Sequence, residues 1–195
     1  MNIQYRILEA PKAGGAFCYT GVELRTHWNL EQTGVYGSLI TAFVGGCDVP
    51  TAHLVDWEDR LQNDRIYAKK MLHFIGEFFG MGIESAVLHQ RLFMVWAERL
   101  LREEGFEIVR SGDDLFVNND LKLSVSIATV SPVSALIHWG INIDSTGAPS
   151  HVKTAGLNLL GWDESRALSF AKKLLTHYIG EIEEIRLAQC KVRPV

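Results

Sequence analysis

The sequence is poor in the features that mark membrane proteins and nucleic-acid-binding proteins. No segment reaches the roughly 18 consecutive apolar residues that a membrane-spanning helix needs, and no apolar stretch follows a basic start at the N-terminus. The formal net charge is −4, which provides no basic stripe for DNA or an anionic membrane. We therefore expect a cytoplasmic protein that binds neither DNA nor a membrane.

Cysteine is also scarce. The three cysteines are Cys18, Cys47 and Cys190, and no two of them are close in the sequence. A disulfide framework needs paired cysteines, and a zinc knuckle needs closely spaced ones. We therefore expect reduced thiols and no structural metal.

The chain does have enough apolar residues for one substantial core. Of its 195 residues, 47% are apolar, and no internal repeat, low-complexity tract or interdomain linker divides the chain. The expected organisation is a single domain over residues 1–195.

Apolar residues at helical spacing predict three helices. The first covers about residues 66–79, where an apolar stripe is followed by a glycine as a stop signal. The second covers about residues 89–104 and also ends at a glycine. The third begins at the capping residue Asp163 and extends to about residue 184.

Strand signals fill much of the remainder, at residues 35–44, 83–88, 106–117, 121–130 and 135–144. The last three follow one another with short connections that contain turn residues, which indicates a meander. The predicted class is α+β, with a largely antiparallel sheet flanked by helices.

Two of these strands carry small and polar residues at alternate positions. Alternation along residues 121–130 and 135–144 puts apolar side chains on one side of each strand. If the two apolar sides coincide, the opposite face gathers Lys122, Ser124, Ser126, His138, Gly140 and Asn142.

This face has the chemistry of a binding site. Lys122 would supply a point charge suited to a carboxylate or phosphate, and Gly140 would let a ligand approach the backbone. Asp113 and Asp114 could hold a magnesium ion or a ligand amine, and Arg91, in the opening of the second helix, could clamp an anion. A solvated sheet face would explain the same residues, so residue chemistry leaves both interpretations open.

The segment DDLFVNNDLKLSVSIAT followed by SALIHWGINID resembles the ligand-holding sheet of biotin and lipoate protein ligases. In those enzymes an Asp and a Lys line the site where the acid is activated as an acyl adenylate. By position, the resemblance implies Asp114 and Lys122 as the matching catalytic pair. It also raises ATP with Mg as a cofactor, a small carboxylate or nucleotide as the ligand, and a protein as the acyl acceptor.

Over nearly its full length, the chain resembles a family of uncharacterised proteins thought to share that ligase fold, which is related to class II aminoacyl-tRNA synthetases. The segments YTGVELRTHW, MLHFIGEFF and CKVRPV carry this likeness. Such a resemblance identifies a fold better than an activity. The oligomeric state stays open, a homodimer included.

The ligase resemblance lacks the nucleotide loop. Biotin ligases carry an Arg- and Gly-rich loop over the adenylate, lipoate ligases carry paired arginines leading into three glycines, and neither occurs in this sequence. Gly45 and Gly46 are the nearest substitute for an anion-binding loop, although a tight turn explains them more simply. The adjacent Cys47 is either a nucleophile, as in octanoyl transferases of this fold, or a buried unreactive thiol.

Three functions remain open. The first is an enzyme that binds a small carboxylic acid or acyl adenylate over Lys122 for acyl activation or transfer. The second is a non-catalytic small-molecule-binding module that has lost the adenylating loop. The third is a metal-dependent hydrolase that uses His73, with Glu77 one turn away, or His89, or the cluster His53, Asp56, Glu58 and Asp59.

Overall fold

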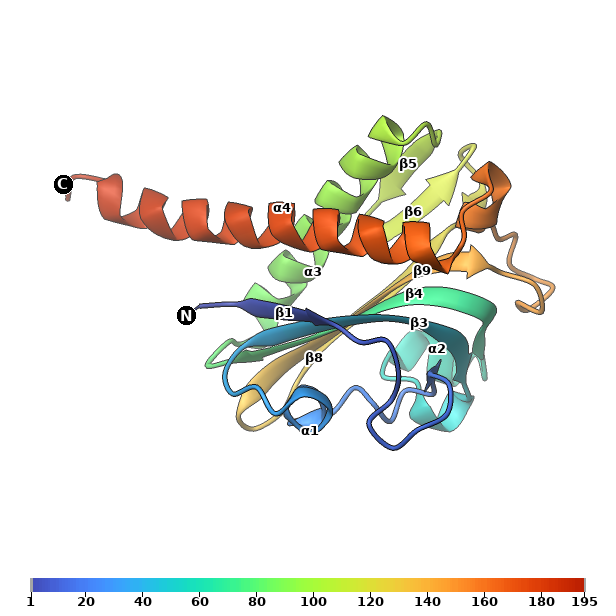
Figure 1. Cartoon of the computed structure of the whole chain (residues 1–195), viewed down its shortest axis with the longest axis horizontal. Coiled ribbons are helices and arrows are strands. Elements are labelled where there is room, and N and C mark those ends of the chain that lie inside the picture. The colour runs from blue at the N-terminus through green and yellow to red at the C-terminus, as the bar shows by residue number, and fades with distance from the viewer. Residues whose placement is uncertain (1, 195) are drawn as a thin grey trace.

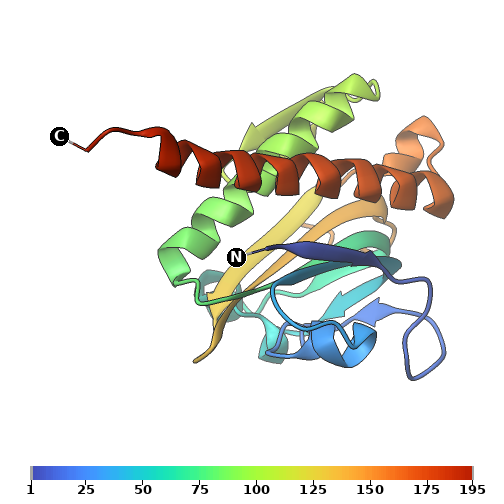
Figure 2. The ribbon, with the colours of Figure 1, turned by 60° about the vertical axis from the view of Figure 1, so that its left-hand side comes forward.

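The centre of the molecule is a mixed sheet whose strands lie in the order β1-β3-β4-β9-β8, with the short β2 paired to β3. The computed structural model describes residues 2–194. Helices α3 and α4 cross one face of the sheet, and α1 and α2 lie on the other side (Figure 1, Figure 2). A smaller sheet of three strands, in the order β5-β6-β7, continues beyond this one. Within residues 2–194, no helix is long and apolar enough to cross a membrane.

The strands are β1 (Gln4–Ile7), β2 (Cys18–Tyr19), β3 (Leu39–Val49), β4 (Ile66–Phe79), β5 (Ile108–Ser111), β6 (Asp114–Val117), β7 (Leu121–Lys122), β8 (Ser124–Val130) and β9 (Ser134–Asp144). The α-helices are α1 (Trp28–Thr33), α2 (Trp57–Leu61), α3 (Ile83–Glu103) and α4 (Glu164–Lys191). Two short 3₁₀ helices are η1 (Thr51–His53) and η2 (Leu157–Leu160).

Buried residues form two clusters, one on each face of the main sheet. The larger cluster lies between the sheet and helices α3 and α4, where Phe93 stacks on Trp139 with ring centroids 4.3 Å apart. The smaller cluster, on the other face, contains Tyr19, Phe43 and Met71. Burial on both faces makes the sheet a rigid platform, and the candidate site lies against the side of the smaller cluster.

Residues 66–79, predicted as a helix, form the central strand β4. It pairs with β3 on one edge and with β9 on the other, and residues 71–78 are all buried. A strand covered on both faces reads as a nearly continuous apolar run, which helical spacing also matches. His73 and Glu77, expected on a polar helix face, are therefore buried within the sheet.

Other boundaries also differ from the prediction. Residues 83–88, predicted as a strand, are the first turns of α3, and α4 continues past residue 184 to Lys191. The strand predicted at 106–117 is the hairpin β5–β6. The α+β class is confirmed, as is Asp163 as the cap of α4, since its Oδ1 accepts a hydrogen bond from the Arg166 N–H at 2.8 Å.

The face assignment along residues 121–130 is wrong because the strand breaks at Leu123, between β7 and β8. Ser126 pairs directly with Trp139, so both side chains lie on the side of α3. Ile127 pairs with His138, and these two lie on the side of the smaller cluster. A one-residue irregularity sends the following side chains to the opposite face of a sheet. The serines and His138 therefore do not share a face.

Gly45 and Gly46 lie inside β3, at an irregularity of its register with β4, and β2 pairs along their other side. The Gly46 N–H donates a hydrogen bond to the Phe17 carbonyl at 3.1 Å. A Cβ on Gly45 would lie 2.5 Å from that same carbonyl oxygen. The glycine pair therefore allows two strands to approach closely and offers no open loop to an anion, contrary to the expectation.

We expect Gly45→Ala to lower the free energy of unfolding by about 1–3 kcal/mol, because backbone atoms cannot move away from the added methyl group. Gly46→Ala is the matched control, since its Cβ would meet nothing closer than Cys18 Sγ at 3.5 Å. Urea unfolding of both variants measures the difference. Equal stabilities for the two variants would contradict this account of β3.

A pair of histidines connects β4 and β9 within the sheet. His73 Nδ1 lies 3.0 Å from His138 Nε2, and His73 Nε2 lies 3.1 Å from the Gly46 carbonyl oxygen. Burial lowers the pKa of His73 to about 3. Burial, and then the neighbouring His73, lower the pKa of His138 well below its usual value. Both imidazoles are therefore neutral at neutral pH.

We expect the stability to fall as the pH decreases below about 6.5, where unfolded histidines bind protons and the buried pair does not. Each such histidine lowers the free energy of unfolding by about 1.4 kcal/mol for every pH unit of acidification. This slope continues until the pH reaches the pKa of that histidine in the folded protein. Urea unfolding between pH 4.5 and 7.5 should therefore show a shallower slope for His73→Gln than for the wild type. The exposed His151→Gln serves as the control, and a slope equal in wild type and His73→Gln would refute a neutral His73.

Candidate functional site

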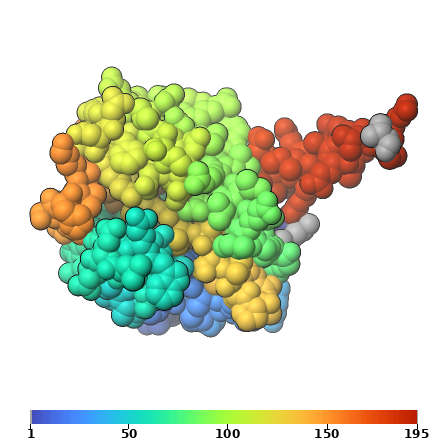
Figure 3. All heavy atoms as spheres, turned by 180° about the vertical axis from the view of Figure 1, so that it is seen from behind, coloured from blue at the N-terminus to red at the C-terminus, as the bar shows by residue number. Residues whose placement is uncertain are grey.

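A cleft of about 300 Å³ opens beside Lys122, at the edge of the main sheet. Its walls come from α2, from the β5–β6 hairpin and from residues 148–154, which lie around it on the face shown in Figure 3. This volume is at the lower end of the range typical of small-molecule sites. The predicted site residues that line it are Asp113, Asp114, Lys122, Ser124, Ser126 and Asn142.

The backbone of Lys122 is bonded to residues 153–155. Its N–H donates to the Lys153 carbonyl at 2.8 Å, and its carbonyl accepts from the Ala155 N–H at 3.0 Å. The ammonium lies 2.9 Å from Asp114 Oδ2, and both side chains are about 30% exposed (31% and 29%). Burial raises the pKa of Asp114, and Lys122 opposes that shift. The result is a positioned cation whose partner carboxylate is only partly solvated.

Asp113 is fixed by a network that reaches α3. Its Oδ2 accepts hydrogen bonds from Gln90 Nε2 at 2.8 Å and from Ser126 Oγ at 2.9 Å. Its Oδ1 lies 3.9 Å from Arg91 Nη2, on the outer side of the hairpin. Ser126 and Gln90 therefore orient Asp113, while Arg91 is not among the residues that line the cleft.

The other two polar residues of the cleft, Ser124 and Asn142, differ in how much of their hydrogen-bonding capacity is already used. Ser124 is fully buried, and its Oγ accepts a hydrogen bond from the Leu115 N–H at 2.8 Å, so it joins β8 to β6. The Asn142 amide lies 3.5 Å from the Lys122 carbonyl, at the limit of a hydrogen bond. Of the predicted polar residues, Asn142 therefore keeps the most capacity to bind a ligand.

The cleft as a whole is acidic. Asp56, Asp59 and Asp64 line it in addition to Asp113 and Asp114. Burial, followed by Asp56 and Asp64, raises the pKa of Asp59.

Among the described residues, two cations line the cleft, Lys122 and Arg65. Arg65 Nη2 lies 2.7 Å from Asp48 Oδ1, which neutralises its charge. Both cations are therefore paired, but the Lys122 side chain is less exposed than that of Arg65 (31% against 55%), so water screens its attraction for an anion less.

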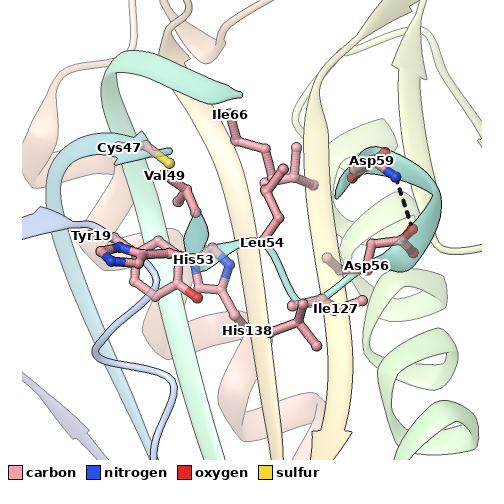
Figure 4. Close-up of a pocket in the computed structure, with 13 residues that line it drawn as sticks. Tyr19, Cys47, Val49, His53, Leu54, Asp56, Asp59, Ile66, Ile127 and His138 are labelled. Carbon is pink, nitrogen blue, oxygen red and sulfur yellow. Dashed lines mark hydrogen bonds between the residues drawn. The ribbon is translucent and has the colours of Figure 1, made fainter. Parts of the chain in front are cut away.

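A second, smaller chamber of about 70 Å³ adjoins the cleft under α2. The two cavities share Asp56, Asp59, Ile66, Val125 and Ser126 as lining residues, so they lie next to each other. In Figure 4, Tyr19, His53 and His138 gather at one end of the chamber, and Asp56 and Asp59 lie at the other. His138 therefore belongs to this chamber and not to the Lys122 cleft.

Gly140 does not open the sheet to a ligand as predicted. The position that its Cβ would take is filled by the Met71 sulfur, and Val125 Cγ2 lies 3.1 Å from it. Gly140 therefore accommodates the packing of neighbouring side chains in the sheet.

Cys47 lines the chamber but is unsuited to nucleophilic attack. It is 1% exposed, and burial, followed by Cys18 and Asp48, raises the pKa of its thiol to about 12. A reactive cysteine needs the opposite shift, because the thiolate is the nucleophile. The structure thus favours the buried, unreactive thiol.

The candidate metal ligands have structural partners. Asp56 Oδ1 accepts the Glu58 N–H at 2.7 Å and the Asp59 N–H at 3.2 Å, which caps α2. His53 Nδ1 lies 2.9 Å from the Thr20 carbonyl oxygen. In residues 2–194, no three His, Cys, Asp or Glu side chains converge as metal ligands.

The other predicted catalytic or metal-binding residues, His73, Glu77 and His89, each bond to partners outside the cleft. Glu77 accepts hydrogen bonds from the His27 N–H at 3.0 Å and from Ser134 Oγ at 2.8 Å, whereas His73 bonds to His138. His89 Nδ1 lies 2.6 Å from the Tyr178 hydroxyl, between α3 and α4. These contacts hold the fold together and do not reach the cleft.

Sequence reasoning missed Gln90 and Tyr19. Gln90 lies beside the predicted Arg91, but only the turn of α3 decides which of the two faces the hairpin. Tyr19 stacks on His138 with ring centroids 3.8 Å apart, across 119 residues of sequence. No local pattern signals that contact.

Relatives in sequence cover almost the whole chain. A family described as Domain of unknown function (DUF366) matches residues 9–193. An uncharacterised protein of Methanocaldococcus jannaschii is 32% identical over 182 residues, covering 91% of this chain and 80% of that protein. A solved structure of a protein of unknown function from Pyrococcus horikoshi is 36% identical, with a TM-score of 0.86 over 98% of this chain and 99% of that one.

More distant structures share the fold alone. A mutant of biotin protein ligase from Aquifex aeolicus, in complex with biotin, is 17% identical, with a TM-score of 0.54 over 94% of this chain and 72% of that one. A T. acidophilum protein with bound lipoic acid, assigned as a candidate lipoate protein ligase, is 10% identical, with a TM-score of 0.56 over 92% and 87%. The chain thus belongs to the DUF366 family and has the α+β fold of the biotin and lipoate protein ligases.

Proposed function

We propose that this protein binds a small carboxylic acid, or an acyl derivative of one, beside Lys122, and that acyl transfer or simple binding is its role. The carrying observation is the Lys122 ammonium, held 2.9 Å from Asp114 at the wall of a cleft of about 300 Å³. Biotin and lipoic acid, bound in the two ligase-like structures, are both carboxylic acids. The ligase resemblance in the sequence implies the same Asp and Lys.

Each polar residue of the cleft has a distinct role in this proposal. Lys122 neutralises the ligand carboxylate by a charge-assisted hydrogen bond. Asp114 competes for the same ammonium and keeps it in place when no ligand is bound. Asn142 donates or accepts a further hydrogen bond, and Gln90 and Ser126 hold the Asp113 carboxylate in a fixed orientation at the cleft wall.

The residues of the cleft favour a role without ATP and Mg. Gly45 and Gly46 lie within paired strands, so they form no phosphate cradle. The five aspartates of the cleft would repel a bare triphosphate more strongly than a single carboxylate. These observations favour a ligand that arrives already activated, or a non-catalytic module, over ATP-dependent activation. Because no three donor side chains converge in residues 2–194, a metal-dependent hydrolase gains no support.

We expect Lys122→Ala to weaken the binding of a carboxylate ligand by about 10- to 100-fold, as the loss of one charge-assisted hydrogen bond predicts. Biotin, lipoate and octanoate are the probes, selected by thermal shift and then titrated by calorimetry. Lys153→Ala is the matched control, since Lys153 pairs with Asp120 at 3.0 Å and is 74% exposed. Unchanged affinity in a folded Lys122→Ala protein would exclude this role for Lys122.

We further expect no acid-dependent release of pyrophosphate when the wild-type protein is mixed with ATP, Mg and each of these three acids. The reason is the missing phosphate cradle, together with the acidic cleft. A coupled pyrophosphate assay, run beside calorimetric binding of the same acid, provides the measurement. Stoichiometric pyrophosphate release that Lys122→Ala abolishes would instead establish ATP-dependent activation.

A further inference from the structure

The chamber under α2 contains two buried polar side chains with unused hydrogen-bonding capacity. Tyr19 is 4% exposed and His138 is 3% exposed, and both line the chamber. Within residues 2–194, the Tyr19 hydroxyl and His138 Nδ1 have no hydrogen-bond partner, whereas His138 Nε2 is bonded to His73. Neither atom is among the fully buried, unpaired side-chain atoms of residues 2–194, which are Arg110 Nε and Trp162 Nε1, so both stay accessible to a small group inside the chamber.

The hydrogen bonds of the histidine pair fix the tautomer of each ring. The Gly46 carbonyl can only accept, so the proton of neutral His73 lies on Nε2. His73 Nδ1 is then an acceptor, and His138 must donate to it from Nε2. Neutral His138 consequently has an unprotonated Nδ1. Its open position accepts a hydrogen bond and cannot donate one.

The chamber also selects against charge. Burial lowers the pKa of His138 and raises that of Tyr19, so His138 remains a neutral acceptor and Tyr19 a neutral donor. The wall near them consists of the apolar Val49, Leu54 and Ile127 together with His53, whose Nδ1 lies 2.9 Å from the Thr20 carbonyl oxygen, while Asp56 and Asp59 lie at the other end of the chamber. An anionic group beside Tyr19 and His138 would therefore lose its hydration without gaining a counter-charge.

We propose that this chamber is a second ligand subsite, which binds a small neutral group that carries an N–H or O–H donor for His138 Nδ1 and an acceptor for the Tyr19 hydroxyl. The chamber volume of about 70 Å³ is roughly five times the space that one water-sized sphere needs, which suits one small ring. His73 is the positioning residue that holds His138 in the accepting tautomer. This inference extends the proposed function, because the chamber adjoins the Lys122 cleft and shares lining residues with it.

Two five-membered rings of equal size test the subsite. Pyrrolidin-2-one has an N–H beside its carbonyl, and cyclopentanone has the carbonyl alone. NMR titration of the wild type should give about five- to tenfold tighter binding of pyrrolidin-2-one, the worth of one hydrogen bond. In His138→Phe, which keeps an aromatic ring against Tyr19, the two affinities should become equal. Lys153→Ala should keep the wild-type ratio, because Lys153 lines neither cavity and lies exposed beside Asp120.

The histidine ¹⁵N spectrum of the wild-type protein supplies a test that needs no variant. We expect His138 to carry its proton on Nε2 in the free protein, and its Nδ1 resonance to shift with pyrrolidin-2-one but little with cyclopentanone. A proton on Nδ1, equal affinity for the two rings, or an unchanged preference in His138→Phe would overturn the proposal. Failure of Lys122→Ala to weaken carboxylate binding would affect only the proposed function.

Discussion

The backbone of Leu123 is the point on which the functional part of this structure depends. Its N–H donates to the Leu115 carbonyl in β6 at 2.8 Å, and its carbonyl accepts from the Asn142 N–H in β9 at 2.8 Å. One residue thus joins the small sheet to the large one. Its side chain is fully buried in the larger core, so the connection cannot shift without opening that core. The break therefore decides which face of the sheet each side chain of β8 occupies.

The break also explains why the charged Lys122 and the neutral His138 line two different cavities. Before it, Lys122 belongs to the small sheet, where pairing with residues 153–155 holds it above the cleft. After it, β8 pairs with β9 in a register that leaves His138 on the opposite side from Ser126. A cation and a neutral acceptor that sequence alternation would place side by side are therefore presented to two adjoining cavities.

The sequence predicted the α+β class, the last helix with its Asp163 cap and the β8–β9 pair, because each depends on local pattern. It failed at β4, whose burial on both faces comes from partners far away in the chain. It also placed the small and polar residues of two strands on one face, and the break at Leu123 separates them. Alternation has no means to anticipate such a break, since a single buried leucine looks the same in a regular strand and at a discontinuity.

The ligase fold of this chain does not by itself imply ligase activity. Related folds keep a platform on which a carboxylate ligand fits, but catalysis with ATP needs a separate phosphate cradle. In this chain, the glycines nearest to such a cradle serve the close approach of β2 to β3, and Cys47 beside them is buried with a raised pKa. Under the two proposals, a ligand would have to divide its polarity between the two cavities. Its acid end would compete with Asp114 for Lys122, and its neutral donor end would bond to His138, so neither end alone would account for selection of the whole ligand.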